Sequence, residues 1–261
     1  LPTQPQGTSA EDVARGIMTT DTVSKVAECV VAGSSARVVG AAKGVGMIEP
    51  NMATLITMMF TDAQVEPSDL NSVFQRVIAK TFNCVSVDTD TSTSDTAIVL
   101  ASGAAGNVDL SAFESALYEV ALSLTKQVAR DGEGAEKLIE VHVDHARDYE
   151  QAKTIAKAIV NSPLVKTAVH GADPNWGRVA MAVGKCSQYL DVNQERVVIR
   201  FGAQEVYPTQ VNDQGLSELS TYMKGADVRI HVSLNTGSTE ATVWGCDLTD
   251  GYVRINADYT T

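Results

Sequence analysis

The chain is poor in cysteine and histidine. It holds four of each, and no two cysteines lie at the CxxC spacing of a redox or zinc pair. Most of the cysteines sit in apolar runs, which predicts buried free thiols and a reducing compartment. The histidines nearest in sequence, His142 and His145, lie in an alternating stretch and would point to opposite faces of a strand. The sequence therefore predicts no metal site.

Positive charge is scarce as well. Lys and Arg number 20 against 32 Asp and Glu, which gives a formal net charge of −12. This balance argues against nucleic acid and anionic membrane surfaces as partners, because both attract clusters of Lys and Arg. No apolar run reaches the ~20 residues that a membrane-spanning helix needs. The start, LPTQPQGTS, lacks the apolar core of a signal peptide.

The apolar pattern predicts helices and strands interspersed along 261 residues, enough for one large domain or two small ones. Mixed sheets layered with helices, an α/β class, follow from this order. The predicted helices are Ala10–Met18 (capped by Ser9), one from Pro67, Leu110–Arg130, Tyr149–Val160, one opened by Asp173 and Pro174 and running to about Cys186, and Leu216–Met223. The predicted strands are Val26–Val31, Arg37–Ala41, buried runs at Leu55–Phe60 and Ala97–Ala101, Lys137–Val143, and VVIRF, DVRIHVSL, EATVWGCDL and YVRINA in the last quarter.

The stretch KGVGMIEPNMAT, Lys43 to Thr54, stands out among the loops. Gly44 and Gly46 permit unusual backbone angles, and Pro50 restricts its own φ angle. A strand follows at once, so Thr54 lies where loop meets strand. The register of the glycines and the strand that follows exclude a dinucleotide site, which needs GxGxxG leading into a helix.

This stretch resembles the self-cleavage motif of the ornithine acetyltransferases, also called glutamate N-acetyltransferases. Five further motifs resemble motifs of the same family and occur in the family's order. Together with Lys43–Thr54, they cover nearly the whole chain. They are IMTTDT, DTDTSTSDT, DGEGAEKLIEV, NSPLVKTAVHGADPNWGRV and GYVRINADYTT.

The resemblance implies a four-layer αββα sandwich and cleavage between Ala53 and Thr54. Residues 1–53 would then be the C-terminal part of an α subunit, and residues 54–261 a β subunit that begins at the nucleophile. The αβ heterodimer would assemble further into a heterotetramer. Family members carry a longer segment before the IMTTDT motif, which holds a Thr-Gly oxyanion-hole pair, so we expect another chain or a preceding segment to supply it.

The implied reaction moves an acetyl group from N-acetylornithine to glutamate in arginine biosynthesis. A threonine hydroxyl needs an adjacent base to act as a nucleophile. Cleavage frees the α-amine of Thr54, whose reference pKa is about 7.7–8.0, and this amine is such a base. No cofactor is required, although acetyl-CoA is an alternative donor in some family members. The implied location is the cytoplasm, or the mitochondrial matrix in a eukaryote.

The resemblance also implies which side chains contact substrate. They are Thr19, Thr20, Lys43, Thr54, Glu133, Asn256 and Thr261. Without it, Lys43 is a solvated loop lysine and Glu133 a turn residue. Which of the two adjacent threonines contacts substrate stays open. The stretch from Asp173 to Arg178 is interpreted as supporting structure with Trp176 in the core, and DTDTSTSDT as hydrogen-bonded turns.

Two other functions remain open at this point. One is a self-cleaving aminopeptidase or amidase of the same fold, in which water accepts the acyl group. The other is a binding module without catalysis, because half of the oxyanion hole is not in the sequence. The matches at Lys43 and at the C-terminal motif favour the transferase.

Overall fold

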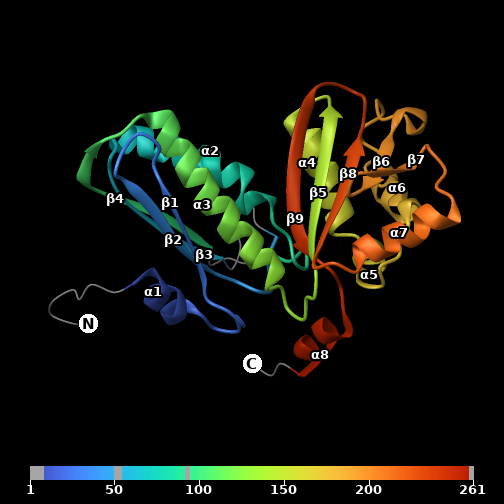
Figure 1. Ribbon diagram of the computed structural model, residues 1–261, viewed down its shortest axis with the longest axis horizontal. Coiled ribbons are helices and arrows are strands. Elements are labelled where there is room, and N and C mark those ends of the chain that lie inside the picture. Colours follow the sequence, from blue (N-terminus) through green and yellow to red (C-terminus); the bar gives the residue numbers. More distant parts are fainter. Residues whose placement is uncertain (1–8, 50–54, 92–94, 259–261) are drawn as a thin grey trace. The chain divides into compact units, whose positions relative to one another are not determined.

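The computed structural model describes residues 9–49, 55–91 and 95–258 (Figure 1). The chain forms two compact units, which are described separately. The first comprises Leu1–Asn83 and Asp90–Asp131, and the second comprises Cys84–Thr89 and Gly132–Thr261. These units differ from the two segments that the predicted cleavage would produce, and that division stays a prediction.

A mixed four-stranded sheet forms the first unit, with the strand order β1-β2-β3-β4. The first three strands pair antiparallel, and β3 and β4 pair parallel. The strands are β1 (Lys25–Val30), β2 (Arg37–Lys43), β3 (Ile56–Gln64) and β4 (Thr96–Asn107). Burial alternates along β3, whereas most of β4 is exposed, so the prediction that Ala97–Ala101 is a buried strand is wrong.

Helix α3 (Leu110–Arg130) packs against β1 and β2 of this sheet. Its apolar residues recur every three or four positions, and they are buried along one face as predicted. Gly40 of β2 allows the close approach, because a methyl group there would lie 2.8 Å from Leu124. Helix α2 (Pro67–Lys80) packs against α3. Helix α1 (Ala10–Ile17) begins with the predicted capping box of Ser9 and Asp12.

The second unit is a five-stranded mixed sheet in the order β7-β6-β8-β5-β9, in which only β5 and β8 pair parallel. Helix α4 packs on β5 and β9, α6 on β6 and α7 on β8 (Figure 1). The strands are β5 (Leu138–Ala146), β6 (Val198–Phe201), β7 (Gln204–Tyr207), β8 (Asp227–Ser233) and β9 (Thr239–Cys246). The helices are α4 (Tyr149–Val160), α5 (Pro163–His170), α6 (Trp176–Gly184), α7 (Asp213–Met223) and α8 (Asp250–Asp258). One mixed sheet with helices in each unit confirms the predicted α/β class.

Several predicted details of this unit are wrong. The stretch YVRINA lies in helix α8, not in a strand, and none of the helix's residues is buried. Helix α6 is capped by Asn175, which accepts the Arg178 amide, so Asp173 and Pro174 precede the helix. Trp176 is 41% exposed and stacks on Tyr207, with ring centroids 4.9 Å apart, instead of lying in the core.

The cysteines follow the prediction. All four are free thiols, and only Cys29 is not fully buried. Within the described ranges, no helix has both the length and the apolar character needed to cross a bilayer.

Candidate active site

The predicted site residues fall into three groups. Ala53, Thr54 and Thr261 lie outside the described residues. Thr19, Thr20 and Lys43 belong to the first unit, and Glu133 and Asn256 to the second. The two described groups are therefore built up one at a time.

Lys43 ends strand β2, and only 9% of it is exposed. Among the described residues its ammonium donates one hydrogen bond, to Oγ1 of Thr19 at 3.2 Å. No carboxylate of the described residues lies within 4.0 Å of this ammonium. A buried ammonium with one neutral acceptor is poorly compensated, and a ligand carboxylate would complete its coordination. Thr19 therefore lies beside Lys43. Among the described contacts, Thr20 forms no hydrogen bond with the Lys43 ammonium.

A buried ion-pair cluster supports the loop that follows. Nζ of Lys25 lies 2.6 Å from Oδ1 of Asp21 and 2.5 Å from Oδ2 of Asp131. Asp21 also accepts the amides of Gly44 at 2.7 Å and Thr19 at 3.3 Å. Burial alone would raise the pKa of Asp21, but the hydrogen bonds from Lys25 and Gly44 outweigh it and lower that pKa. One carboxylate thus holds both the residue beside Lys43 and the start of the loop that leads to Thr54.

The backbone of this loop turns at two places. Gly44 has a φ of 147° and Met47 a φ of 54°, so the unusual conformation predicted for Gly46 occurs at Met47 instead. Past the loop, the Leu55 amide donates to Oδ1 of Asp95 at 2.5 Å, and the Leu55 carbonyl accepts the Thr96 amide at 2.9 Å. Burial raises the pKa of Asp95. The backbone N–H and the backbone C=O of Leu55, the residue directly after Thr54, are therefore both hydrogen-bonded.

In the second unit, the structure brings two predicted residues together. Oε2 of Glu133 accepts a hydrogen bond of 2.8 Å from Nδ2 of Asn256. Asn256 lies on α8, and Glu133 lies in the DGEGA loop before β5. Within the part of the chain that the structure describes, no Lys or Arg is within 4.0 Å of the Glu133 carboxylate. The Glu133 carboxylate would therefore suit the ammonium group of a ligand.

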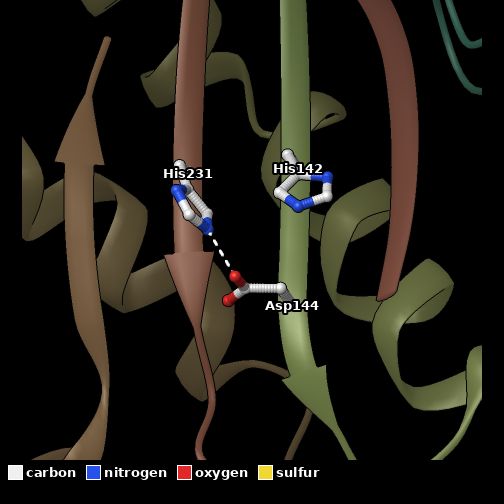
Figure 2. Close-up of side chains that lie close together, drawn as sticks. All are labelled: His142, Asp144 and His231. Carbon is white, nitrogen blue, oxygen red and sulfur yellow. Dashed lines mark ion pairs between the residues drawn. The ribbon is translucent and has the colours of Figure 1, made fainter. Parts of the chain in front are cut away.

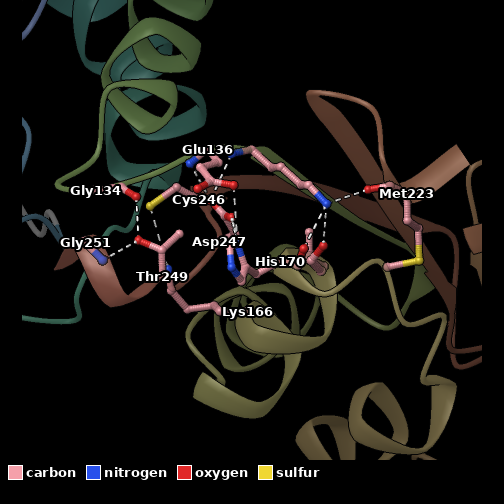
Figure 3. Close-up of polar contacts among 11 residues, drawn as sticks. Gly134, Glu136, Lys166, His170, Met223, Cys246, Asp247, Thr249 and Gly251 are labelled. Carbon is pink, nitrogen blue, oxygen red and sulfur yellow. Dashed lines mark hydrogen bonds and ion pairs between the residues drawn. The ribbon is translucent and has the colours of Figure 1, made fainter. Parts of the chain in front are cut away.

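Glu133 also lines a cavity of about 180 Å³ whose walls all come from this unit. Lys166, Cys246 and Tyr252 contribute to the lining. The Lys166 ammonium donates to the carbonyl of Val87 at 2.9 Å. Figure 3 shows Lys166 and Cys246 near Thr249, whose hydroxyl donates to the Gly134 carbonyl at 2.6 Å. The DGEGA loop, through Glu133, and helix α8, through Tyr252, therefore both line this cavity.

Comparison with known proteins decides the family. The model of the ArgJ family matches residues 2–261 of the chain. The chain belongs to the ArgJ family. It is 60% identical, over 95% of its length, to the arginine biosynthesis bifunctional protein ArgJ 2 of Nostoc, and 56% identical, again over 95%, to the glutamate N-acetyltransferase Oat2 of Streptomyces clavuligerus. It spans 64% of the length of each of these ArgJ relatives.

The crystal structure of an ArgJ protein from Bacillus halodurans is similar as well. Its TM-score is 0.71 at 42% sequence identity, and the match covers 76% of this chain and 96% of that one. This similarity confirms the predicted fold class, since the ArgJ structure shares the layered arrangement of helices and mixed sheets.

Sequence reasoning missed the supporting residues of this ArgJ chain. Asp21 and Asp131 lie inside the motifs TTDT and DGEGA but were given no role. Lys25, which links them, belongs to no motif. The motif DTDTSTSDT predicts a local turn for Asp95, yet its carboxylate accepts a hydrogen bond from the distant amide of Leu55. Asp21, Asp95 and Asp131 are charged residues inside the family motifs, and this position could have pointed to them. Nothing in the sequence singles out Lys25, because it lies outside every motif.

Gly134 provides the first testable prediction. Its φ is +68°, and a methyl group there would lie 2.4 Å from the amide nitrogen of Tyr252 and 2.6 Å from the carbonyl carbon of Gly251. We expect Gly134→Ala to force the DGEGA loop away from α8, to break the Glu133–Asn256 hydrogen bond and to lower the free energy of unfolding by about 2–4 kcal/mol, from left-handed strain plus overpacking. Urea unfolding measures this loss.

Gly106→Ala is the matched control. Gly106 has a φ of +80°, but no atom lies within 4 Å of a methyl group there. It should show only the backbone strain, about 1–2 kcal/mol. Equal losses in the two variants would mean that the contact with α8 does not restrict position 134.

Proposed function

We propose that this ArgJ-family chain is the acyl-transfer part of a glutamate N-acetyltransferase, which moves the acetyl group of N-acetylornithine to glutamate. In this proposal the chain is cut between Ala53 and Thr54, and the freed threonine attacks the amide carbonyl. Ornithine leaves, and glutamate then takes the acetyl group from the Thr54 ester. The α-amine of Thr54 accepts the hydroxyl proton and returns it to the departing amine.

The observation that supports this function best is the buried ammonium of Lys43, which has no carboxylate partner in the described part of the chain. Both substrates carry an α-carboxylate, and an ammonium with one neutral hydrogen bond suits such a group. Glu133 has the opposite charge and no cationic partner among the described residues, which suits the side-chain ammonium of ornithine. The names of the relatives from Nostoc and Streptomyces clavuligerus agree with acetyl transfer in arginine biosynthesis.

The remaining parts of the proposal concern assembly and conditions. The αβ heterodimer associates into a heterotetramer in the cytoplasm and needs no cofactor, with acetyl-CoA as an alternative donor. Thr20 and Thr261 complete the substrate contacts. These statements rest on the family alone.

The test is mass spectrometry of the full-length protein. Incubation with N-acetylornithine alone should add one acetyl group to the fragment that begins at Thr54, and glutamate should remove it. Double-reciprocal plots should be parallel, as in a ping-pong reaction. Intersecting plots without an acetylated fragment would mean direct transfer. Release of the acetyl group to water, at a rate that glutamate does not change, would instead indicate an amidase.

Lys43→Met tests the carboxylate contact. In cleaved protein we expect it to weaken binding of N-acetylornithine by roughly 1.5–3 kcal/mol, the range for a hydrogen bond to a charged group. Isothermal titration calorimetry measures the change. Lys185→Met removes the same charge from an exposed position after α6 and should leave the affinity as it was. Unchanged affinity in both variants would show that Lys43 does not contact substrate.

A further inference from the structure

Three potential metal ligands gather on one face of the second sheet. Figure 2 shows His142 and Asp144 on β5 and His231 on the neighbouring β8. His142 and His231 are direct partners across the parallel pair of strands, and partners share a face. Asp144 follows His142 by two residues and therefore points to the same face. Two central strands thus hold the three side chains, and none of the residues assigned to acyl transfer is among them.

The separations suit a single small cation. The donor atoms of the three side chains all lie within 4.8 Å of one another. Nε2 of His231 is 2.9 Å from Oδ2 of Asp144, and the ring centroids of the two histidines are 4.9 Å apart. Zn²⁺ binds imidazole nitrogen and carboxylate oxygen at about 2.0–2.2 Å, which puts two tetrahedral ligands about 3.4 Å apart. Small rotations of the side chains would reach this geometry.

Each imidazole can offer the lone pair of its Nε2 to an ion in the tautomer that carries the proton on Nδ1. Nε2 of His231 is buried and forms no hydrogen bond, although the Asp144 carboxylate lies beside it. Nδ1 of His142 lies 2.9 Å from Oγ1 of Thr242, its partner on β9. When Nδ1–H of His142 donates a hydrogen bond to this hydroxyl, Nε2 of the same ring carries a lone pair that can bind a metal ion. Hydrogen bonds of this kind orient the histidines of known metal sites.

The Asp144 carboxylate is the acidic member of this cluster and lies within reach of both imidazoles.

The basic residues nearby are already paired. Arg229 lies 3.3 Å from the carboxylate of Glu140, and Arg200 lies 3.7 Å from that of Glu205. Their charges are therefore offset by neighbouring acids on the same face.

A second cluster in this unit lacks these properties. His170 and Glu136 lie near Asp247, but Asp247 accepts the amides of Glu136 and Lys137 with one oxygen and faces Nδ1 of His170 at 3.0 Å with the other (Figure 3). One oxygen of the Asp247 carboxylate is therefore already held by two backbone amides. The two clusters therefore provide an internal comparison.

We infer that His142, Asp144 and His231 bind a divalent transition-metal ion, with Zn²⁺ the best fit. Glu240 supplies the fourth ligand, because its carboxylate lies 3.9 Å from Nε2 of His142 and is exposed enough to move, or a water molecule takes that position. The ion joins the two central strands of the second unit and stabilises their pairing, since a ligand that binds only the folded state favours that state.

The experiment uses full-length protein dialysed against a chelator and then titrated with zinc chloride in a calorimeter. We expect one Zn²⁺ per chain and a rise in melting temperature on binding. His231→Gln should abolish both. Thr242→Val, which removes only the hydroxyl beside His142, should weaken binding by about 10–100-fold. Co²⁺ should give the visible absorption of a tetrahedral site in the wild type and not in His231→Gln.

His170→Gln is the matched control, because it removes a histidine from the second cluster, formed by Glu136, His170 and Asp247. This variant should bind Zn²⁺ as the wild type does. If His231→Gln does not fold, the weaker binding of Thr242→Val decides. Wild-type protein that takes up no zinc overturns the inference. So does equal affinity in the wild type and in His231→Gln or Thr242→Val, or loss of binding in His170→Gln alone.

Discussion

Replacing Thr54 by alanine is expected to leave the chain as one uncut polypeptide and to abolish acyl transfer. Without the hydroxyl, nothing at this position attacks the preceding carbonyl, so the α-amine is never freed. Removing a nucleophile lowers the rate by at least roughly 10⁴-fold in enzymes of this kind. A denaturing gel shows the missing cleavage, and mass spectrometry after incubation with N-acetylornithine shows the missing acetyl group.

Thr54→Ser is the control for this variant, because it keeps the hydroxyl. It should be cut and should carry an acetyl group, although more slowly. A Thr54→Ala chain that is still cut would show that an outside protease does the work. An acetyl group found on the Thr54→Ala protein would place the acyl carrier at another residue.

Lys25→Met is expected to destabilise the first unit strongly. The Lys25 side chain is fully buried and is the cation between Asp21 and Asp131, whose side chains are 1% and 6% exposed. Removing it leaves two buried carboxylates without their counter-charge. Breaking a buried pair in this way costs about 3–5 kcal/mol. Urea unfolding at pH 7 measures the loss, and slower cleavage before Thr54 should accompany it because Asp21 also holds Gly44.

The loss should depend on pH. In the wild type the pKa of Asp21 is lowered, so the stability it contributes is present above its unfolded value of about 3.9 and is lost as the pH falls below that value. In Lys25→Met, protonation of one carboxyl relieves the repulsion, so that protein gains stability as the pH falls. The difference in free energy of unfolding between the wild type and Lys25→Met should therefore become smaller from pH 7 towards pH 4. A constant difference would contradict the ion-pair account.

Lys137→Met provides the comparison. Lys137 is also a buried lysine, but its ammonium donates to the carbonyls of Val169, His170 and Met223 and to no carboxylate of the described residues. Its loss should destabilise the protein as well, because three carbonyls each lose a hydrogen bond from a charged donor, although that of Val169 still accepts the Ala172 amide. The stability difference between Lys137→Met and the wild type should not become smaller at low pH, because this substitution removes no partner of an acidic group.

Local pattern was enough for the long elements and for the family. The apolar spacing over Leu110–Arg130 predicts α3 with both of its ends, because a 21-residue helix has enough turns for its period to be distinct. The capping box of Ser9 and Asp12 predicts the start of α1 for the same local reason. Short segments were less certain. YVRINA alternates between apolar and polar residues like a strand, yet it lies in α8. Val253 is 62% exposed there, and no described strand pairs with this segment.

The sequence by itself determined the class of fold, the family and the side chains expected to contact substrate, because these depend on periodicity and on motifs that lie close together along the chain. Only the tertiary structure decided which side chains support them. The Asp21–Lys25–Asp131 cluster and the Asp95 contact with Leu55 join residues far apart in sequence. The pairing of His142 with His231 depends on the parallel register of β5 and β8, and a register between distant strands is decided by the packing of the whole sheet.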